Sequence, residues 1–362
     1  MTSKRTSILW PLLILAIAAL WAAQSLGVLP ASAVELVSRA WPVALVALGL
    51  LLLLGRRVRF GNIISIALSA VLVGGMMVAA VGRQGQRFST DQQKPFTQVI
   101  DPQVTSVKIV VNMLNTQIDV TAGGKSAIIG EFIGSKDSLV TADYKVDGTT
   151  GTLTLGESQN STLPSLESLG RGKLTLALPI GATISQVTAN ITGRSGDVSL
   201  DAAGTALTDL TITAEAGGVK LGVLPETLAN LTIAANAGAV AFDTLPNSLS
   251  ALTVSAATGD LALDASSTSL KNMTVTANAG AANIKLPNKA GLIGTIKASG
   301  DVTISVPASI AASVKLAGNA SNNPTYNQGD YILTIDKTLI SRRSNDQQMQ
   351  ITVDTPGHAT IQ

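Results

Sequence analysis

GDVSL, residues 196–200, is the first of six copies of one five-residue phrase: glycine, a small or acidic residue, an aliphatic, a free position and a large aliphatic. The other copies are GGVKL at 217–221, GAVAF at 238–242, GDLAL at 259–263, GAANI at 280–284 and GDVTI at 300–304. Four of the five intervals are 21 residues and the last is 20. A fixed period in this range is typical of solenoids, whose repeats stack as successive coils. The phrase therefore predicts a β-solenoid.

A second strand is predicted between successive phrases, because apolar and polar residues alternate there and alternation buries one face of a strand. The apolar residues of this strand are Leu210/Ile212, Leu231/Ile233, Leu252/Val254, Met273/Val275 and Ile296. Threonines lie between them, at 211, 232, 253, 274 and 295. Each coil then holds two or three short strands. The fold class is all-β, a single-stranded right-handed β-helix whose regular coils cover about residues 172–307.

The phrase residues are expected to stack in two buried columns. One column is Val198, Val219, Val240, Leu261, Ala282 and Val302; the other is Leu200, Leu221, Phe242, Leu263, Ile284 and Ile304. The phrase glycine should mark either a positive φ or a place where coils approach too closely for a Cβ. GTLTL at Gly151, GKLTL at Gly172 and GHATI at Gly357 resemble further copies with altered spacing. A solenoid must cap its ends, and residues 104–150 and 308–362 are the predicted caps.

Composition excludes several functional classes. Only 13% of the residues are charged and 3% are aromatic, and the net charge of +2 gives no field that would attract nucleic acid. The chain has no cysteine, which excludes disulfides, thiol catalysis and cysteine-based zinc sites. His358 is the single histidine, which excludes a histidine-cluster metal site.

Three apolar stretches precede the repeats, at residues 8–29, 40–54 and 60–81. The first and third have the roughly 20 residues that a bilayer-spanning helix needs, while the second is short. We therefore predict a transmembrane helical region at 1–82, a juxtamembrane linker at 83–103 and a solenoid at 104–362. None of the three stretches contains an ionisable side chain, which argues against a transporter.

The basic residues set the expected topology. Lys4 and Arg5 precede the first stretch, and Arg56, Arg57 and Arg59 lie between the second and third. The positive-inside rule then places the N-terminus in the cytoplasm and the solenoid outside the cell membrane.

Two alternatives remain open. Residues 1–33 could be a signal peptide cleaved after Ala31-Ser32-Ala33, which also leaves the solenoid outside. If the stretch 40–54 does not span the bilayer, the solenoid lies in the cytoplasm.

Catalysis on a β-helix needs a group of carboxylates on one face. The acidic phrase residues are Asp197, Asp260 and Asp301. At strand spacing these lie about 14 Å and about 10 Å apart, whereas glycosidases need about 5 Å or about 6.5–9.5 Å. The interpretation is that each Asp caps a turn by bonding its own backbone. Arg194 and Glu215, on adjacent coils, could form a surface ion pair of little energetic weight.

The sequence also resembles a known family. The segments LWPLLILAIAAL and AWPVALVALGLLLLLGRR resemble the N-terminal membrane region of LiaF-like bacterial envelope-stress proteins. The repeats SGDVSL, TGDLAL and SGDVTI resemble the "putative-adhesin" or toast-rack β-solenoid that often follows it. The resemblance implies a β-helix at the membrane that acts by protein or envelope contacts, and it supplies no catalytic residues.

The function expected from the sequence is therefore non-enzymatic. A membrane-anchored solenoid would bind a membrane or envelope protein or a cell-wall component, with a role in envelope-stress sensing. An adhesin-like module for a surface or carbohydrate is the alternative, which the scarcity of exposed aromatics weakens. A polysaccharide-acting enzyme is a remote third. No catalytic, cofactor-binding or metal-binding residue is predicted, and the predicted partners are the lipid bilayer and a protein, with no nucleic acid.

Overall fold

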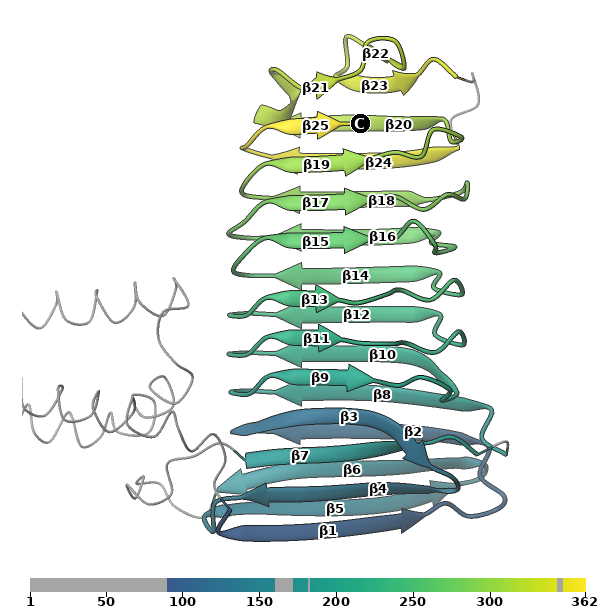
Figure 1. Cartoon of the computed structure of the whole chain (residues 1–362), viewed down its shortest axis with the longest axis vertical. Helices are drawn as coiled ribbons and strands as arrows, with labels where there is room; N and C mark the ends of the chain where they lie inside the picture. Colours follow the sequence, from purple (N-terminus) through teal and green to yellow (C-terminus); the bar gives the residue numbers. More distant parts are fainter. Residues whose placement is uncertain (1–89, 160–171, 182, 344–347) are drawn as a thin grey trace, which may run out of the picture.

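Stacked β-strands form an elongated rod in the computed structural model, which describes residues 90–159, 172–181, 183–343 and 348–362 (Figure 1). The predicted membrane region 1–82 and its three spans lie outside the described residues. Within the described part of the chain, no helix has the length and apolar character to cross a bilayer. The fold of that part is all-β, as the repeats predict.

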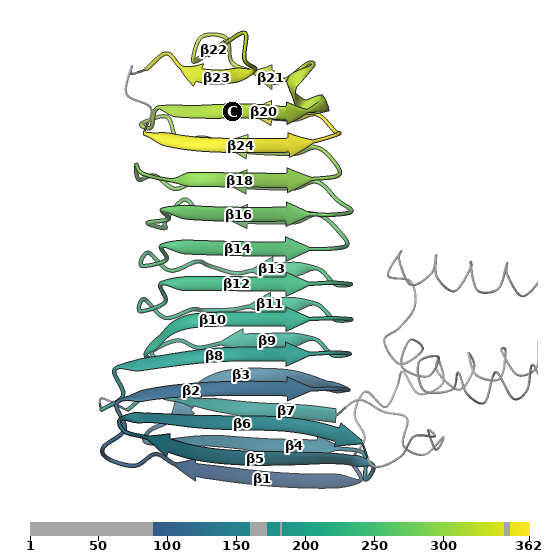
Figure 2. The same cartoon turned by 180° about the vertical axis from the view of Figure 1, so that it is seen from behind.

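One face of the rod is a single sheet of 13 strands (Figure 2). In spatial order its strands are β22 (Tyr331–Leu333), β23 (Thr338–Ser341), β20 (Ala312–Gly318), β24 (Met349–Thr355), β18 (Ile293–Ala298), β16 (Asn272–Ala277), β14 (Ala251–Ala256), β12 (Asn230–Ala235), β10 (Leu207–Ala214), β8 (Gln186–Gly193), β2 (Ser106–Met113), β6 (Thr150–Gln159) and β5 (Ser138–Asp147). At a strand spacing of about 4.8 Å, this sheet is about 58 Å long.

The opposite face consists of two sheets, one of seven strands and one of five. The first contains β1 (Gln92–Val99), β4 (Ala127–Gly134), β7 (Gly172–Pro179), β3 (Thr116–Gly124), β9 (Val198–Asp201), β11 (Val219–Leu221) and β13 (Val240–Phe242). The second contains β15 (Leu261–Asp264), β17 (Ala282–Lys285), β19 (Val302–Ser305), β25 (Ala359–Ile361) and β21 (Thr325–Tyr326). A short 3-10 helix, η2, covers Asn319–Ser321.

The predicted columns exist. Val198 pairs with Val219 and Val219 with Val240, and Leu261, Ala282 and Val302 follow in the same way in the second sheet. All six are buried between the two faces, where each larger aliphatic contributes about 1.5–3 kcal/mol. Each regular coil has two strands, one on each face, so the columns form one continuous core.

The ladder on the two-sheet face is interrupted between β13 and β15, which are consecutive phrase strands but belong to different sheets. On the other face β12 and β14 remain paired over six residues. Phe242, the aromatic member of the leucine column, is half-buried at this interruption. The hydrogen-bonded ladder is therefore broken at one step, although Val240 and Leu261 on its two sides both remain buried in the core.

The phrase glycines are required by close approach rather than by positive φ. A Cβ built on Gly217 would lie 2.1 Å from the carbonyl oxygen of Gly196, and one on Gly238 would lie 2.2 Å from that of Gly217. Only Gly259 among the phrase glycines has a positive φ, 84°, and there an added Cβ meets nothing. The glycine column thus lets neighbouring coils touch backbone to backbone at one corner.

At both ends of the rod the coils do not follow sequence order. The coil β2–β3 lies between the coils β6–β7 and β8–β9, and the coil β24–β25 lies between β18–β19 and β20–β21. Stacking in strict sequence order is therefore wrong at both ends, because strand pairing follows complementary side chains and not chain position.

The strand pairing shows which of the irregular phrase copies lie in the phrase column. GHATI at Gly357 does continue the phrase column, since Ala359 pairs with Val302 and Ile361 with Ile304. GKLTL joins it too, but through an intervening copy, TQIDV at 116–120, that has Thr116 in the glycine position. GTLTL at Gly151 is not a copy, because it lies in β6 on the other face.

The N-terminal end is closed by antiparallel strands, with β1 and β4 on one face and β5 on the other. β1 starts at Gln92, inside the predicted linker 83–103. Lys94 and Pro95 on this outermost strand discourage pairing with another sheet edge.

Candidate functional site

The acidic phrase residues connect neighbouring coils. Asp197 Oδ1 accepts a hydrogen bond from Gly218 N (2.9 Å), and Asp260 Oδ1 accepts one from Ala281 N (2.9 Å). Asp301 Oδ1 does the same with His358 N (2.7 Å). Each acceptor therefore caps the backbone of the next coil, which corrects the expectation that it would bond its own turn. The role is structural.

The charged pairs along the flank are also between coils. Arg194 and Glu215 form the predicted pair, at 3.9 Å and with both side chains largely exposed. Lys285 Nζ lies 2.8 Å from Asp264 Oδ2 one coil away. Hydrogen bonds from Lys285 and then from Ser266 lower the pKa of Asp264 from 3.8 to about 2. No group of three or more metal-ligating side chains exists among the residues that the structure describes.

Glu157 is a buried carboxylic acid in the N-terminal coils. One of its carboxyl oxygens accepts hydrogen bonds from Leu114 N (2.8 Å), Asn115 N (3.0 Å) and Thr116 Oγ1 (2.8 Å). The other oxygen accepts from Ser138 Oγ (2.9 Å). All of these donors lie at the corner between β2 and β3 or at the start of β5. Glu157 thus fixes the intercalated coil to the end of the rod, which sequence patterns did not reveal.

The solvent-facing threonines of the long sheet form one column. Thr211, Thr232, Thr253, Thr274, Thr295 and Thr352 are paired in register across six adjacent strands. Threonine suits an exposed strand position by its β-branched side chain. The column offers a regular, uncharged strip, and its periodicity alone identifies no ligand.

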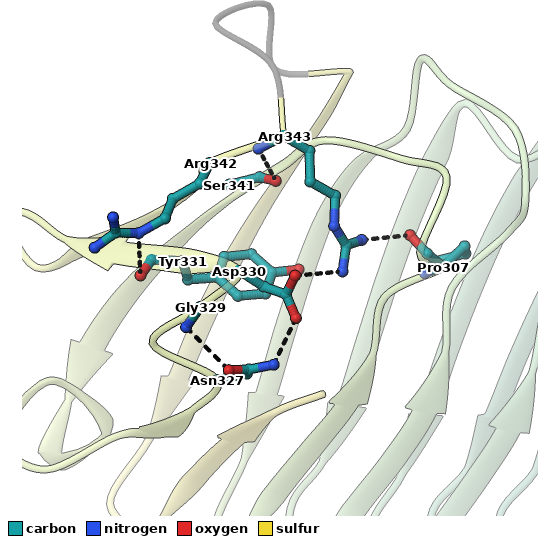
Figure 3. Close-up of polar contacts among 8 residues, drawn as sticks. All are labelled: Pro307, Asn327, Gly329, Asp330, Tyr331, Ser341, Arg342 and Arg343. Carbon is teal, nitrogen blue, oxygen red and sulfur yellow. Dashed lines mark hydrogen bonds and ion pairs between the residues drawn. The ribbon is translucent and has the colours of Figure 1, made fainter.

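The end of the rod opposite β1 is a cap built from β20 to β23 (Figure 1). Arg343 Nη2 lies 3.0 Å from Asp330 Oδ1, and Arg343 Nη1 donates to the carbonyl oxygen of Pro307 (3.3 Å). Asn327 Nδ2 donates to the other oxygen of Asp330 (2.7 Å). Arg343 therefore holds this cap to the β19–β20 connection, whereas Arg342 Nε donates to the carbonyl oxygen of Tyr331 (3.4 Å) within the cap, as Figure 3 shows.

Two isoleucines are exposed on this cap. Ile332 in β22 is 47% exposed, and Ile335 in the turn between β22 and β23 is fully exposed. β22 is the outermost strand of the long sheet. Sequence analysis did not single these residues out, although an isoleucine within the polar run Thr334-Ile335-Asp336-Lys337 is a recognisable signal.

His358 lies beside this cap. Its Nε2 is 2.9 Å from Thr325 Oγ1, and its backbone N–H binds Asp301. The histidine is exposed on the surface of coil β24–β25, and among the residues placed by the structure it belongs to no group of three or more potential metal ligands.

Comparison with known protein families agrees with this architecture. A family model described as Toastrack DUF4097 matches residues 107–355, more than half of the chain. No curated protein matches the chain.

Several solved structures are similar. They include "a putative cell adhesion protein" from Clostridium sporogenes, with 15% identity, a TM-score of 0.29, and coverage of 75% of this chain and 99% of that one. A "putative adhesin" from Bacteroides fragilis has 12% identity, a TM-score of 0.29, and coverage of 75% and 98%. Another from Parabacteroides merdae has 10% identity, a TM-score of 0.25, and coverage of 76% and 98%.

Proposed function

Because the chain belongs to the Toastrack DUF4097 family, we propose that it is a non-enzymatic, membrane-anchored protein whose solenoid binds a protein partner. The apolar stretches 8–29, 40–54 and 60–81 would anchor it with the N-terminus in the cytoplasm and the solenoid outside, as in LiaF-like proteins. In this proposal the β1 end faces the bilayer and the β22 end points away from it.

The observation that carries the proposal is the pair of exposed isoleucines at the β22 end. Ile332 and Ile335 are presented on a cap that Arg343 and Asp330 hold in place. Exposed large apolar side chains at the outer end of a rigid support suit a contact surface for another protein. The acidic residues of the phrase, in contrast, are occupied in bonding backbone amides.

The test compares single substitutions at the tip with a matched one on the flank. Full-length protein with Ile335→Ser or Ile332→Ser would be solubilised from membranes after cross-linking, beside Ile293→Ser. Ile293 is 61% exposed on the long sheet and serves as the control. We expect the tip variants to lose at least about tenfold of a co-purifying membrane or envelope protein, since buried apolar anchors contribute about 1–2 kcal/mol or more each.

A second assay with the same variants distinguishes the carbohydrate-binding alternative from the protein-partner proposal. Binding of the full-length chain to a glycan array, unchanged by the tip substitutions, would support an adhesin-like carbohydrate module and overturn the protein-partner proposal. A co-purifying sensor kinase or its regulator would extend the proposal to envelope-stress sensing.

A further inference from the structure

The coil β24–β25 is an insert between two coils that are consecutive in the chain. β24 pairs in parallel with β18 on one side and with β20 on the other, and β25 pairs with β19 and β21. The segment β18–β21 therefore forms both walls of a two-strand slot. The strand that precedes the insert, β23, pairs with β20 and β22 and not with β24.

The slot fits its occupant closely. Gly294 interrupts the column of large residues that runs through Leu252 and Met273, and a Cβ at Gly294 would lie 2.8 Å from the δ-methyl of Ile351. Ile351 thus fills a hollow that the glycine leaves. At the corner, a Cβ on Gly357 would lie 2.7 Å from the carbonyl group of Gly300. The insert therefore follows the same corner rule as the regular coils.

The main-chain bonds of the insert also go to the walls of the slot. Val302 N donates to His358 O (2.8 Å), and Gln362 N donates to Ile304 O (2.9 Å). Met349, Val353 and Ile361 are fully buried between the walls. The same side-chain and main-chain contacts would form if the insert came from a second copy of the chain. Only the covalent link through the polypeptide makes the insert dock in the slot of its own chain.

We propose that the coil β24–β25 is exchangeable and that the slot binds the same coil from a second copy of this chain. Such an exchange makes the same contacts in both states, which is why swapped dimers form at low energetic cost. The slot can be open whenever β18–β23 have folded and the insert has not docked. This inference does not depend on the proposed function.

The structure limits the geometry of the exchange. Arg343 is held to the cap by Asp330 and Pro307, so the chain as far as Arg343 stays with its own cap. From Arg343 to Met349 the chain can span at most about 20 Å. Two molecules that exchange this coil must therefore lie with their β22 ends side by side.

The coil β2–β3 at the other end is also intercalated but does not share this property. It continues directly through β4 to β7, which pack around it, and Glu157 bonds its corner. Withdrawing it would require the whole N-terminal end to unfold. The exchange is thus specific to one end of the rod.

The test uses the absence of cysteine from the chain. Thr303 and Thr360 are paired across the boundary between wall and insert, and Asn283 and Thr303 are paired across the preceding boundary. Full-length Thr303→Cys would be mixed under oxidising conditions, in detergent, with full-length Thr360→Cys in one sample and Asn283→Cys in another. Adjacent strand positions are close enough for a disulfide.

We expect a disulfide-linked heterodimer with Thr360→Cys, at least about tenfold more abundant than with Asn283→Cys. A double variant with both Thr303→Cys and Thr360→Cys in one chain checks that the pair can form its bond. Efficient bonding within this double variant, with no heterodimer from the mixed single variants, would overturn the proposal. Equal heterodimer yields in the two mixtures would also overturn it, because they would show random surface cross-linking.

Discussion

Replacement of Gly217 by alanine tests the close approach of the coils. The new Cβ would lie 2.1 Å from Gly196 O, and an ordinary C–H···O contact needs about 3.3 Å, so the two coils must separate by about 1 Å at this corner. Three hydrogen bonds cross this boundary nearby: Val198 N to Gly218 O, Gly218 N to Asp197 Oδ1, and Gly222 N to Leu200 O, at 2.8–2.9 Å. Lengthened to about 3.9 Å, they are lost. At about 1 kcal/mol each, the cost is about 3 kcal/mol.

Gly259→Ala is the matched control, because it changes the same phrase position two coils away. Its added Cβ meets nothing, so the cost is that of a left-handed residue, about 1–2 kcal/mol. Urea unfolding of the full-length chain in detergent, followed by far-UV circular dichroism, gives both free energies of unfolding. Hydrogen exchange should show faster amide exchange on both sides of the Gly217 corner. The reasoning is refuted if Gly217→Ala destabilises no more than Gly259→Ala.

Three further predictions concern the polar contacts. Asp260→Ala should lower the free energy of unfolding by about 1 kcal/mol and speed hydrogen exchange at the amide of Ala281. Asp260→Asn keeps an acceptor oxygen and should do neither. Equal effects of the two substitutions would contradict the role of the acceptor. Glu157→Ala should cost about 3 kcal/mol in urea unfolding, because it leaves the buried Asn115 N and the partly buried Leu114 N without an acceptor. A cost no larger than that of an exposed substitution would contradict this. The depressed pKa of Asp264, about 2, means that its pairing with Lys285 stabilises the fold above about pH 4 and that this contribution is lost as the pH falls toward 2. Because the pair is about half exposed, the contribution is about 0.5 kcal/mol, measurable as a smaller loss of stability on acidification in Asp264→Asn; an unchanged acid dependence in that variant would refute it.

The regular part of the fold could be predicted from the sequence because the residues that determine it all repeat with one period. The glycine, the two aliphatic positions and the threonine recur together, so the strand register found for one coil applies to every regular coil. Val198, Val219 and Val240 do superpose. The break after β13 could not be predicted, because GDLAL keeps the phrase while the geometry at Gly259 changes.

The order of coils at the ends could not be predicted for a different reason. TQIDV at 116–120 has Thr116 where the phrase requires glycine, so the pattern skipped a strand that nevertheless lies between Gly172 and Gly196. Its neighbours supply the missing space, since Gly196 leaves room for the Thr116 backbone. Local patterns identify which segments can form coils, but the order in which the coils stack depends on contacts between segments about 35 to 80 residues apart.

The candidate contact residues were less predictable than the fold. The pairing of Arg343 with Asp330 depends on the hairpin β22–β23, which no sequence pattern indicated. The acidic phrase residues were correctly interpreted as backbone caps, but on the wrong backbone. A side chain at a coil corner is as close to the next coil as to its own turn, and sequence alone does not distinguish the two acceptor geometries.

The interruption between β13 and β15 gives the rod unequal bending stiffness. On one side, the continuous sheet through β12 and β14 resists any lengthening, because elongation there would break six residues of ladder. On the other side no ladder joins β13 to β15, so that side resists lengthening less. A sideways load should therefore flex the molecule about a single transverse axis near its middle, with the long sheet as the inextensible side.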